Sequence, residues 1–198
     1  MIVGVRHAEV WNPGNVVYAS LPGFHLSDSG RVEADRLAHR LSAAPIVAVH
    51  ASPLDRAQET ATILAEPHGL GVRTDDRLLE WAFWAHWEGV PWDRIRDRDP
   101  GLLEAYASDP TSVWPEAPLE AAGRRIVEWA ADAEGVEGAG PDRVVLGVTH
   151  EAPLIAAMLV GRGDGLRAFH STNLPHLALV RLRPPPPERV EPAAVGGG

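Results

Sequence analysis

The sequence predicts a single α/β domain, a three-layer sandwich in which helices cover both faces of a mainly parallel sheet. Apolar runs that are typical of buried strands occur at residues 1–6, 45–50, 143–148 and 177–182. Segments with helical spacing lie between these runs, and this alternation is the pattern that builds a parallel sheet. The 198 residues, of which 45% are hydrophobic, are enough for one domain with a substantial core.

The first half of the chain reads as strand, loop, helix, strand and helix. The strand at residues 1–6 leads into a turn-rich loop over residues 8–26. A helix is expected from Ser27 or Asp28, since both residue types cap helix starts. After the strand at residues 45–50, Ser52-Pro53 favours a further helix that extends to about residue 65.

The middle of the chain is rich in tryptophan. A short strand is expected at residues 72–73, and residues 77–92 then carry Trp81, Trp84, Trp87 and Trp92. The spacing of three between the first three suits one packed helical face, and the aromatic density suits a pocket wall. Residues 91–114 show weaker patterns and are expected to form a lid or insertion of short helices.

The second half repeats the alternation. A helix is expected over residues 119–133, a strand over residues 143–148, a helix to about residue 160 and a last strand over residues 177–182. Residues 184–198 contain prolines, charges and terminal glycines, so a disordered tail is predicted there. The catalytic domain would then cover residues 1–183.

Composition narrows the possible functions. The net charge of −9 argues against nucleic-acid or anionic-membrane partners, because both require an extended basic face. There is no leader-like segment or membrane-spanning run, so the expected location is the cytoplasm. The chain has no cysteine, which excludes thiolate chemistry, and all eighteen basic residues are arginine. An anion site would therefore use guanidinium groups or imidazoles.

Two arginines and two histidines lie at or just after the ends of predicted strands. Arg6 and His7 lie at the end of the first strand, Arg56 in the first turn after the second, and His150 at the end of the strand at residues 143–148. Because the carboxyl ends of parallel strands meet at one edge, these side chains are expected to form a compact anion pocket. His50 also ends a strand and is a possible supporting residue. We interpret the remaining histidines as surface or packed residues: His25, His39, His68, His86, His170 and His176.

Five motifs in order resemble those of the histidine phosphatase superfamily, also called the phosphoglycerate mutase-like family. They cover about residues 2–160: Arg6-His7-Ala8-Glu9, Leu26-Ser27-Asp28-Ser29-Gly30-Arg31, Ser52-Pro53-Leu54-Asp55-Arg56-Ala57-Gln58-Glu59-Thr60-Ala61, Leu79-Glu80 with Trp87-Glu88-Gly89, and Val148-Thr149-His150.

The resemblance implies a phosphoglycerate mutase-like fold and a metal-independent phosphomonoesterase without a cofactor. His7 would be the nucleophile that becomes phosphorylated, and Arg6, Arg56 and His150 would bind the transferred phosphoryl group. Glu80 would be the proton donor, with Glu88 as the alternative. Asn12 and Glu9 are candidate phosphate or leaving-group contacts, although Asn12 also suits a role in capping its loop.

Two residues depart from the family pattern. Ala8 replaces the usual glycine, which is easily accommodated only where the backbone φ is negative. Glu151 places a negative charge after His150 and is expected to weaken anion binding. Hydrolysis of a small phosphorylated metabolite is the expected activity, because a short lid gives a mutase intermediate little cover. A mutase-type phosphotransferase and a non-catalytic phosphate-binding protein remain alternatives, and the sequence leaves the substrate and oligomeric state open.

Overall fold

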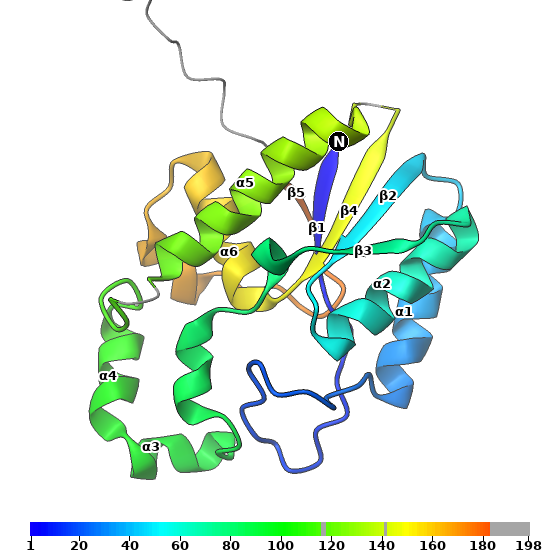
Figure 1. Cartoon of the computed structure of the whole chain (residues 1–198). Coiled ribbons are helices and arrows are strands. Elements are labelled where there is room, and N and C mark those ends of the chain that lie inside the picture. Colours follow the sequence, from blue (N-terminus) through cyan, green and yellow to red (C-terminus); the bar gives the residue numbers. More distant parts are fainter. Residues whose placement is uncertain (116–117, 141, 183–198) are drawn as a thin grey trace, which may run out of the picture.

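The computed structural model describes residues 1–115, 118–140 and 142–182, and it has a five-stranded sheet between two helical layers (Figure 1). The sheet order is β3-β2-β4-β1-β5, and all neighbouring strands are parallel except β5, which is antiparallel to β1. The predicted α/β fold with a mainly parallel sheet is thus confirmed. The strands are β1 (Ile2–Arg6), β2 (Ile46–Ala51), β3 (Val72–Thr74), β4 (Val144–Thr149) and β5 (Leu179–Leu182).

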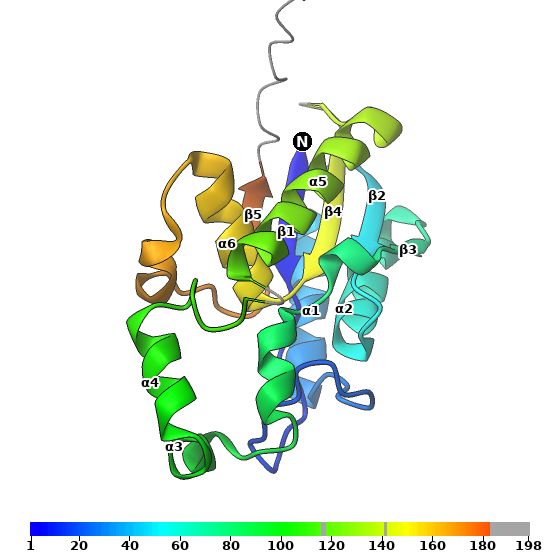
Figure 2. The ribbon, with the colours of Figure 1, turned by 60° about the vertical axis from the view of Figure 1, so that its left-hand side comes forward.

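Each face of the sheet is covered by two helices (Figures 1 and 2). Helices α1 (Asp28–Leu41) and α2 (Asp55–Ala65) share a core cluster with Val5 of β1. Helices α5 (Leu119–Glu137) and α6 (Glu151–Arg162) share another cluster with Ile2. The side chains of a strand alternate between faces, so one apolar strand supplies both clusters. No helix in the described part of the chain is long and apolar enough to cross a membrane.

The loop over residues 8–26 and most of the short helices lie beyond the carboxyl edge of the sheet (Figure 1), whereas the short helix at Glu66–His68 joins the end of α2 to the start of β3. The tryptophan-rich segment forms a 3₁₀ helix, which has three residues per turn and therefore aligns residues three apart. Trp81 and Trp87 are buried, and Trp84 faces a cavity, so both interpretations of this segment hold. The short helices are η1 (Glu66–His68), η2 (Asp76–Leu78), η3 (Ala82–Trp87), η4 (Trp92–Arg94), α3 (Ile95–Arg98), α4 (Pro100–Ser108) and η5 (Leu166–Ser171).

Several boundaries differ from the sequence prediction. Helix α2 begins at Asp55 instead of at Ser52-Pro53, because Leu54 keeps extended backbone angles. Helix α5 continues past residue 133 and ends where Gly138 adopts the left-handed conformation, with a φ of 61°. The predicted tail at residues 184–198 lies outside the described residues, and the extent of the domain stays a prediction.

Helix α1 is docked against the segment that follows β1. Ser27 caps the helix by accepting a hydrogen bond from the Gly30 N–H, and the Ser27 N–H donates to the Glu9 carbonyl. A Cβ atom at Gly30 would lie 2.2 Å from that carbonyl oxygen. Only glycine therefore allows this close approach, which fixes the backbone directly after His7.

Candidate active site

The strand register places the two predicted histidines side by side. Arg6 of β1 pairs with Thr149 of β4, and the His7 N–H continues the ladder to the Thr149 carbonyl at 3.0 Å. His7 and His150 follow at the same edge, with their ring centroids 5.2 Å apart. Both side chains are buried, His7 with 2% exposure and His150 with none. The expected meeting of the residues at one edge of the sheet is therefore what the fold produces.

The surroundings of His7 define its tautomer. Its Nδ1 lies 2.7 Å from the Ala8 carbonyl oxygen, which can only accept, so Nδ1 carries the hydrogen and Nε2 keeps its lone pair. Burial, followed by the charge of Arg56, lowers the pKa of His7 well below 6.5. His7 is thus neutral near pH 7, with one ring nitrogen free to attack.

Ala8 fits the position where the family pattern has glycine. Its side chain is fully buried, and its N–H donates to the Thr60 hydroxyl at 3.1 Å. Among the described residues, the positive-φ positions do not include Ala8, so its Cβ causes no backbone strain. The alanine is therefore compatible with the geometry of the nucleophile.

Two arginines, Arg6 and Arg56, act on His7 through their positive charge. Arg56 is buried at the start of α2, where it donates to the Ala19 carbonyl at 2.7 Å and lies 4.8 Å from the centre of the Tyr18 ring. Arg6 contacts the Leu174 carbonyl and forms an ion pair with Glu151 at 3.0 Å. The Nε atoms of both arginines are buried and have no hydrogen-bond partner.

His150 presents a third buried donor without a partner. Its Nε2 lies 2.9 Å from the Ser52 hydroxyl, which also accepts from the Leu54 N–H at 3.4 Å. The hydroxyl is then able to donate to Nε2, and in this arrangement Nδ1 of the neutral ring carries the hydrogen. This Nδ1 is buried and unpaired. Burial, followed by the charge of Arg56, also lowers the pKa of His150 well below 6.5.

Glu80 lies beside these donors. Its Oε1 accepts from the Trp81 N–H at 2.8 Å, and its Oε2 is 4.0 Å from Nδ1 of His150. Burial raises the pKa of Glu80 above 4.5, although Arg56 opposes the shift. Glu88, the alternative acid, instead accepts hydrogen bonds from the N–H and the hydroxyl of Ser20, at 2.7 and 2.5 Å, and does not line the cavity.

A cavity of about 310 Å³ opens onto His7, Arg6 and Glu80. Asn12 does not line it, because its amide bonds with the Val16 backbone within its own loop, at 2.8 and 3.1 Å. Glu9 is likewise directed elsewhere, since it accepts from the Ser27 hydroxyl at 2.5 Å. The structure thus favours the loop-capping interpretation of Asn12. In the described part of the chain, no three His, Asp or Glu side chains are grouped so as to hold a metal ion.

His176, which the sequence predicts to be a surface or packed residue, lies beside His7. Its ring lies 5.6 Å from that of His7, and burial together with Arg6 lowers its pKa to about 4. The neighbouring Leu177 N–H donates to the Arg6 carbonyl at 3.0 Å. Because β5 runs antiparallel to β1, the residues before β5 lie at the carboxyl end of β1. The orientation of that last strand is the signal that identifies His176.

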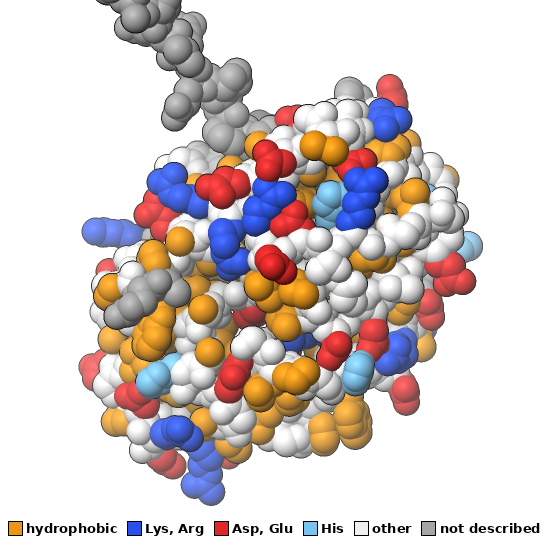
Figure 3. Space-filling model, in the orientation of Figure 1, with side chains coloured by type: hydrophobic (Ala, Val, Ile, Leu, Met, Phe, Trp, Pro, Cys, Tyr) orange, Lys and Arg blue, Asp and Glu red, His pale blue; other side chains and the backbone are white. Residues whose placement is uncertain are grey.

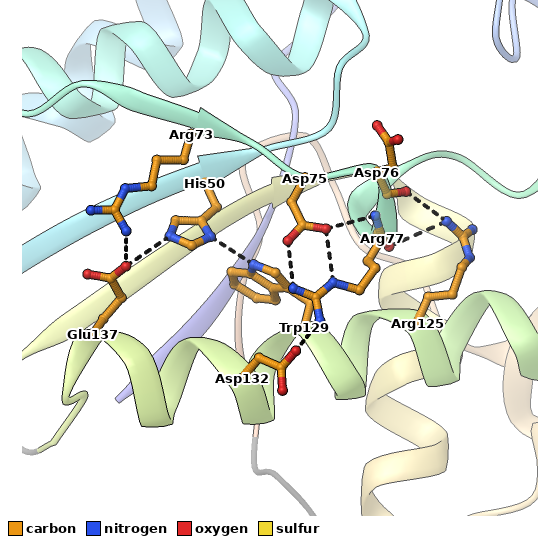
Figure 4. A network of polar contacts seen from close by, with 9 residues as sticks. All are labelled: His50, Arg73, Asp75, Asp76, Arg77, Arg125, Trp129, Asp132 and Glu137. Carbon is orange, nitrogen blue, oxygen red and sulfur yellow. Dashed lines mark hydrogen bonds and ion pairs between the residues drawn. The ribbon is translucent and has the colours of Figure 1, made fainter.

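Glu80 is held from the side of α5 by Arg125. The guanidinium of Arg125 donates to the backbone carbonyls of η2, at 3.2 Å to Asp76 and 3.4 Å to Arg77 (Figure 4). It also reaches the carbonyls of Leu79 and Glu80, at 3.3 and 3.5 Å. One side chain therefore binds most of the segment that carries the candidate acid.

His50 belongs to the same interface between α5 and the sheet, away from the cavity. It accepts a hydrogen bond from Nε1 of the buried Trp129 at 3.0 Å, and its other ring nitrogen is 3.7 Å from Glu137 (Figure 4). The ring of Trp129 leaves no room for a Cβ at Gly147, which would lie 2.2 Å away. His50 thus joins β2 to α5 and does not line the cavity, so its prediction as a supporting residue of the anion pocket stays a prediction.

Comparisons with known proteins agree with this geometry. The model of the histidine phosphatase superfamily (branch 1) matches residues 2–190. An uncharacterised protein of Mycobacterium tuberculosis is 41% identical over 178 residues, which cover 90% of this chain and 85% of that protein. Glucosyl-3-phosphoglycerate phosphatase of the same organism is 33% identical over 166 residues, 79% of this chain and 72% of its own.

Solved structures show the same similarity. The structure of mycobacterial glucosyl-3-phosphoglycerate phosphatase with VO3 aligns to this chain with a TM-score of 0.78 and 27% identity. The alignment covers 90% of this chain and 90% of that one. Bacillus stearothermophilus YhfR has a TM-score of 0.79 and 26% identity, and covers 92% of this chain and 91% of its own.

Proposed function

The chain belongs to the histidine phosphatase superfamily, and on this basis we propose that it hydrolyses phosphate monoesters of small metabolites through a phosphohistidine on His7. One observation carries the proposal: Arg6, Arg56 and His150 each keep a buried donor atom without a partner, and all three residues lie close to His7. The charges of Arg6 and Arg56 lower the pKa of His7, and the His150 ring lies 5.2 Å from the His7 ring. Buried donors normally have partners, and a phosphoryl group supplies three acceptor oxygens.

The first step transfers the phosphoryl group to the protein. Nε2 of His7 attacks phosphorus in line, the N–P bond forms and the bond from phosphorus to the ester oxygen breaks. Glu80, whose raised pKa favours the protonated form, gives its proton to the departing alkoxide. The alcohol then leaves as a neutral molecule.

The second step returns the site to its starting state. The Glu80 carboxylate takes a proton from a water molecule, whose oxygen attacks phosphorus and breaks the N–P bond. Inorganic phosphate leaves, and Nε2 of His7 regains its lone pair. Arg6, Arg56 and the Nδ1–H of His150 counter the charge on the phosphoryl oxygens in both steps, so the mechanism requires no metal ion.

The sequence leaves two alternatives to hydrolysis, and each would give a different result in an activity assay. A mutase would return the phosphoryl group to a second hydroxyl, and a non-catalytic relative would bind phosphate without turnover. The relatives named above as phosphatases support hydrolysis. The cytoplasmic location and the absence of nucleic-acid and membrane partners stay predictions of the sequence.

The test is to quench the protein rapidly during turnover of an aryl [³²P]phosphate. We expect acid-labile, base-stable label on His7, with inorganic phosphate as the product. His7→Ala should lose the label and reduce turnover by at least about a thousandfold, the scale seen when a covalent nucleophile is removed.

The matched control is His39→Ala, because His39 is exposed on α1. This variant should keep both label and turnover. Label on another residue, or turnover that survives in His7→Ala, would contradict the assignment. Phosphate binding without turnover in the wild type would instead support the non-catalytic alternative.

A further inference from the structure

Large aromatic and aliphatic side chains line the cavity together with its polar groups. They are Trp84, Trp92, Tyr106, Ile155 and Phe169, and the first three, which contact one another, are called the aromatic wall below. Hydrophobic side chains also gather around the middle of the face shown in Figure 3. Trp84 packs edge-to-face with both Trp92 and Tyr106, at centroid distances of 5.4 and 5.2 Å. A rigid aromatic wall of this kind suits a flat apolar group.

The charges that line the same cavity oppose a second anionic group. Among the described residues that line the cavity, Arg6 is the one arginine. Its guanidinium forms an ion pair with Glu151 at 3.0 Å. Glu151 contributes a carboxylate, and Glu80 contributes a carboxyl group that burial holds toward its neutral form by raising its pKa, so neither attracts an anion. His170 bonds through Nε2 to the Tyr106 carbonyl at 2.8 Å, so that nitrogen donates within the protein. Among the described lining residues, a carboxylate on the alcohol part of a substrate would find no arginine that is free of an ion pair.

We propose that the cavity accepts phosphate esters whose alcohol part is an uncharged apolar ring, and that Glu151 excludes esters whose alcohol carries a carboxylate. The proposal rests on the proposed phosphatase function, because it places the phosphoryl group at His7 and Arg6. The ring would lie along the aromatic wall, where burial of apolar area stabilises the complex. The carboxylate of Glu151 would repel a second carboxylate in a partly water-excluded site.

This selectivity differs from that suggested by the relative named above as a phosphatase. Its name specifies glucosyl-3-phosphoglycerate, whose glycerate part carries a carboxylate. Glu151 is the first residue of α6, directly after His150, and its side chain is 36% exposed. It lines the cavity and pairs with Arg6, so a ligand in this cavity would meet its carboxylate.

Matched phosphonates test the proposal without turnover. The two probes are 4-carbamoylphenylphosphonate and 4-carboxyphenylphosphonate, which have the same ring and similar size. Titration calorimetry at pH 7.5 should give the carboxylated probe a Kd at least about tenfold higher on the wild-type protein. Glu151→Gln should reduce this ratio to about threefold or less, because the repelling charge is gone.

The control for charge is Glu104→Gln, which removes a carboxylate from an exposed position of α4 outside the cavity lining. It should keep the wild-type ratio. In Glu151→Gln the loss of the ion pair releases Arg6, which could raise the affinity for both phosphonates. Because this gain would be the same for both probes, it does not change the ratio of their Kd values.

The aromatic wall is tested with 2-naphthylphosphonate. Trp92→Ala should weaken its binding by about tenfold, while Trp11→Ala should leave it unchanged. Trp92 is 44% exposed and lines the cavity, whereas Trp11 is 66% exposed and lies elsewhere. Both are partly exposed tryptophans, so a general effect of losing an indole ring would appear in both variants.

Four results would overturn the inference. The first two are equal Kd values of the two matched probes on the wild type, and a ratio of these Kd values that is unchanged in Glu151→Gln. The others are tighter binding of a cationic probe, 4-(aminomethyl)phenylphosphonate, than of the carbamoyl probe, and no binding of any probe. Failure of hydrolysis is a separate result. A protein that binds the phosphonates selectively but turns over no aryl phosphate would keep the inference and refute the proposed activity.

Discussion

His7 and Glu80 share one pocket, yet their pKa values are shifted in opposite directions. Burial lowers the pKa of the imidazole below 6.5 and raises that of the carboxyl group above 4.5. Each shift favours the neutral form, in which His7 is a nucleophile and Glu80 is an acid. The same cause therefore prepares both groups for the first step of phosphoryl transfer.

This pairing predicts how activity depends on pH and leaving group. For an alkyl phosphate, kcat/KM should fall at low pH as His7 takes up a proton and at high pH as Glu80 loses one. Glu80→Gln should lower kcat/KM for the alkyl ester by about a hundredfold and for p-nitrophenyl phosphate by less than about tenfold, because nitrophenolate leaves without a proton. The alkaline limb of the alkyl profile should disappear in this variant.

Glu88→Gln is the matched control for that measurement. Glu88 bonds to Ser20 outside the cavity, so both esters should keep wild-type rates in this variant. Equal losses for both esters in Glu80→Gln, or a larger loss in Glu88→Gln, would contradict the assignment of the acid.

Among the elements, α5 controls the position of Glu80 through Arg125. Arg125→Ala removes the donors to the carbonyls of residues 76, 77, 79 and 80. We expect kcat/KM for alkyl phosphates to fall by about tenfold, with a smaller change for p-nitrophenyl phosphate, because a displaced acid matters most for poor leaving groups. Arg125→Lys should recover part of the activity, since it restores a donor without the forked geometry.

Arg124 offers a neighbouring control. It is paired on the exposed face of α5 with Glu120, at 2.6 Å. Arg124→Ala should leave both esters and the melting temperature nearly unchanged, because exposed ion pairs contribute little. If Arg125→Ala slowed both esters equally, the positioning role would be wrong and a general loss of structure would be the better explanation.

The helices and strands differ in how well the sequence predicts them and the site residues they carry. Strands and most helices follow from apolar periodicity, and the edge that holds Arg6, His7 and His150 follows from their places at strand ends. His176 depends on the antiparallel return of β5, a long-range pairing that periodicity does not encode. The binding of Arg125 to backbone carbonyls carries no sequence signal, because it depends on how α5 packs beside η2.

In the whole molecule, four partly or fully buried histidines have lowered pKa values: His7, His50, His150 and His176. Between pH 6.5 and each lower native pKa, the unfolded chain binds more protons than the folded one. The free energy of unfolding therefore rises with pH in this range and falls as the pH is lowered. Each histidine that stays neutral in the folded protein lowers the free energy of unfolding by up to about 1.4 kcal/mol for each pH unit below about 6.5.

Urea unfolding at pH 7.5, 6.5 and 5.5 checks this expectation. The free energy of unfolding should fall more steeply below pH 6.5 than above it, and His176→Gln should show a shallower fall. His39→Gln serves as the control, because His39 is exposed on α1. A free energy of unfolding that stays constant from pH 7.5 to 5.5 would contradict the predicted proton linkage.

The two histidines of the site and its aromatic wall come from different stretches of the chain. His7 and His150 follow β1 and β4 of the sheet, whereas Trp84, Trp92 and Tyr106 belong to the short helices between residues 82 and 108. A protein built in this way is modular. On the proposed function, mutations in the short helices would alter which alcohol is accepted while His7 and His150 keep their places at the strand ends. Substrate range would then be free to diverge between lineages without the nucleophile being rebuilt.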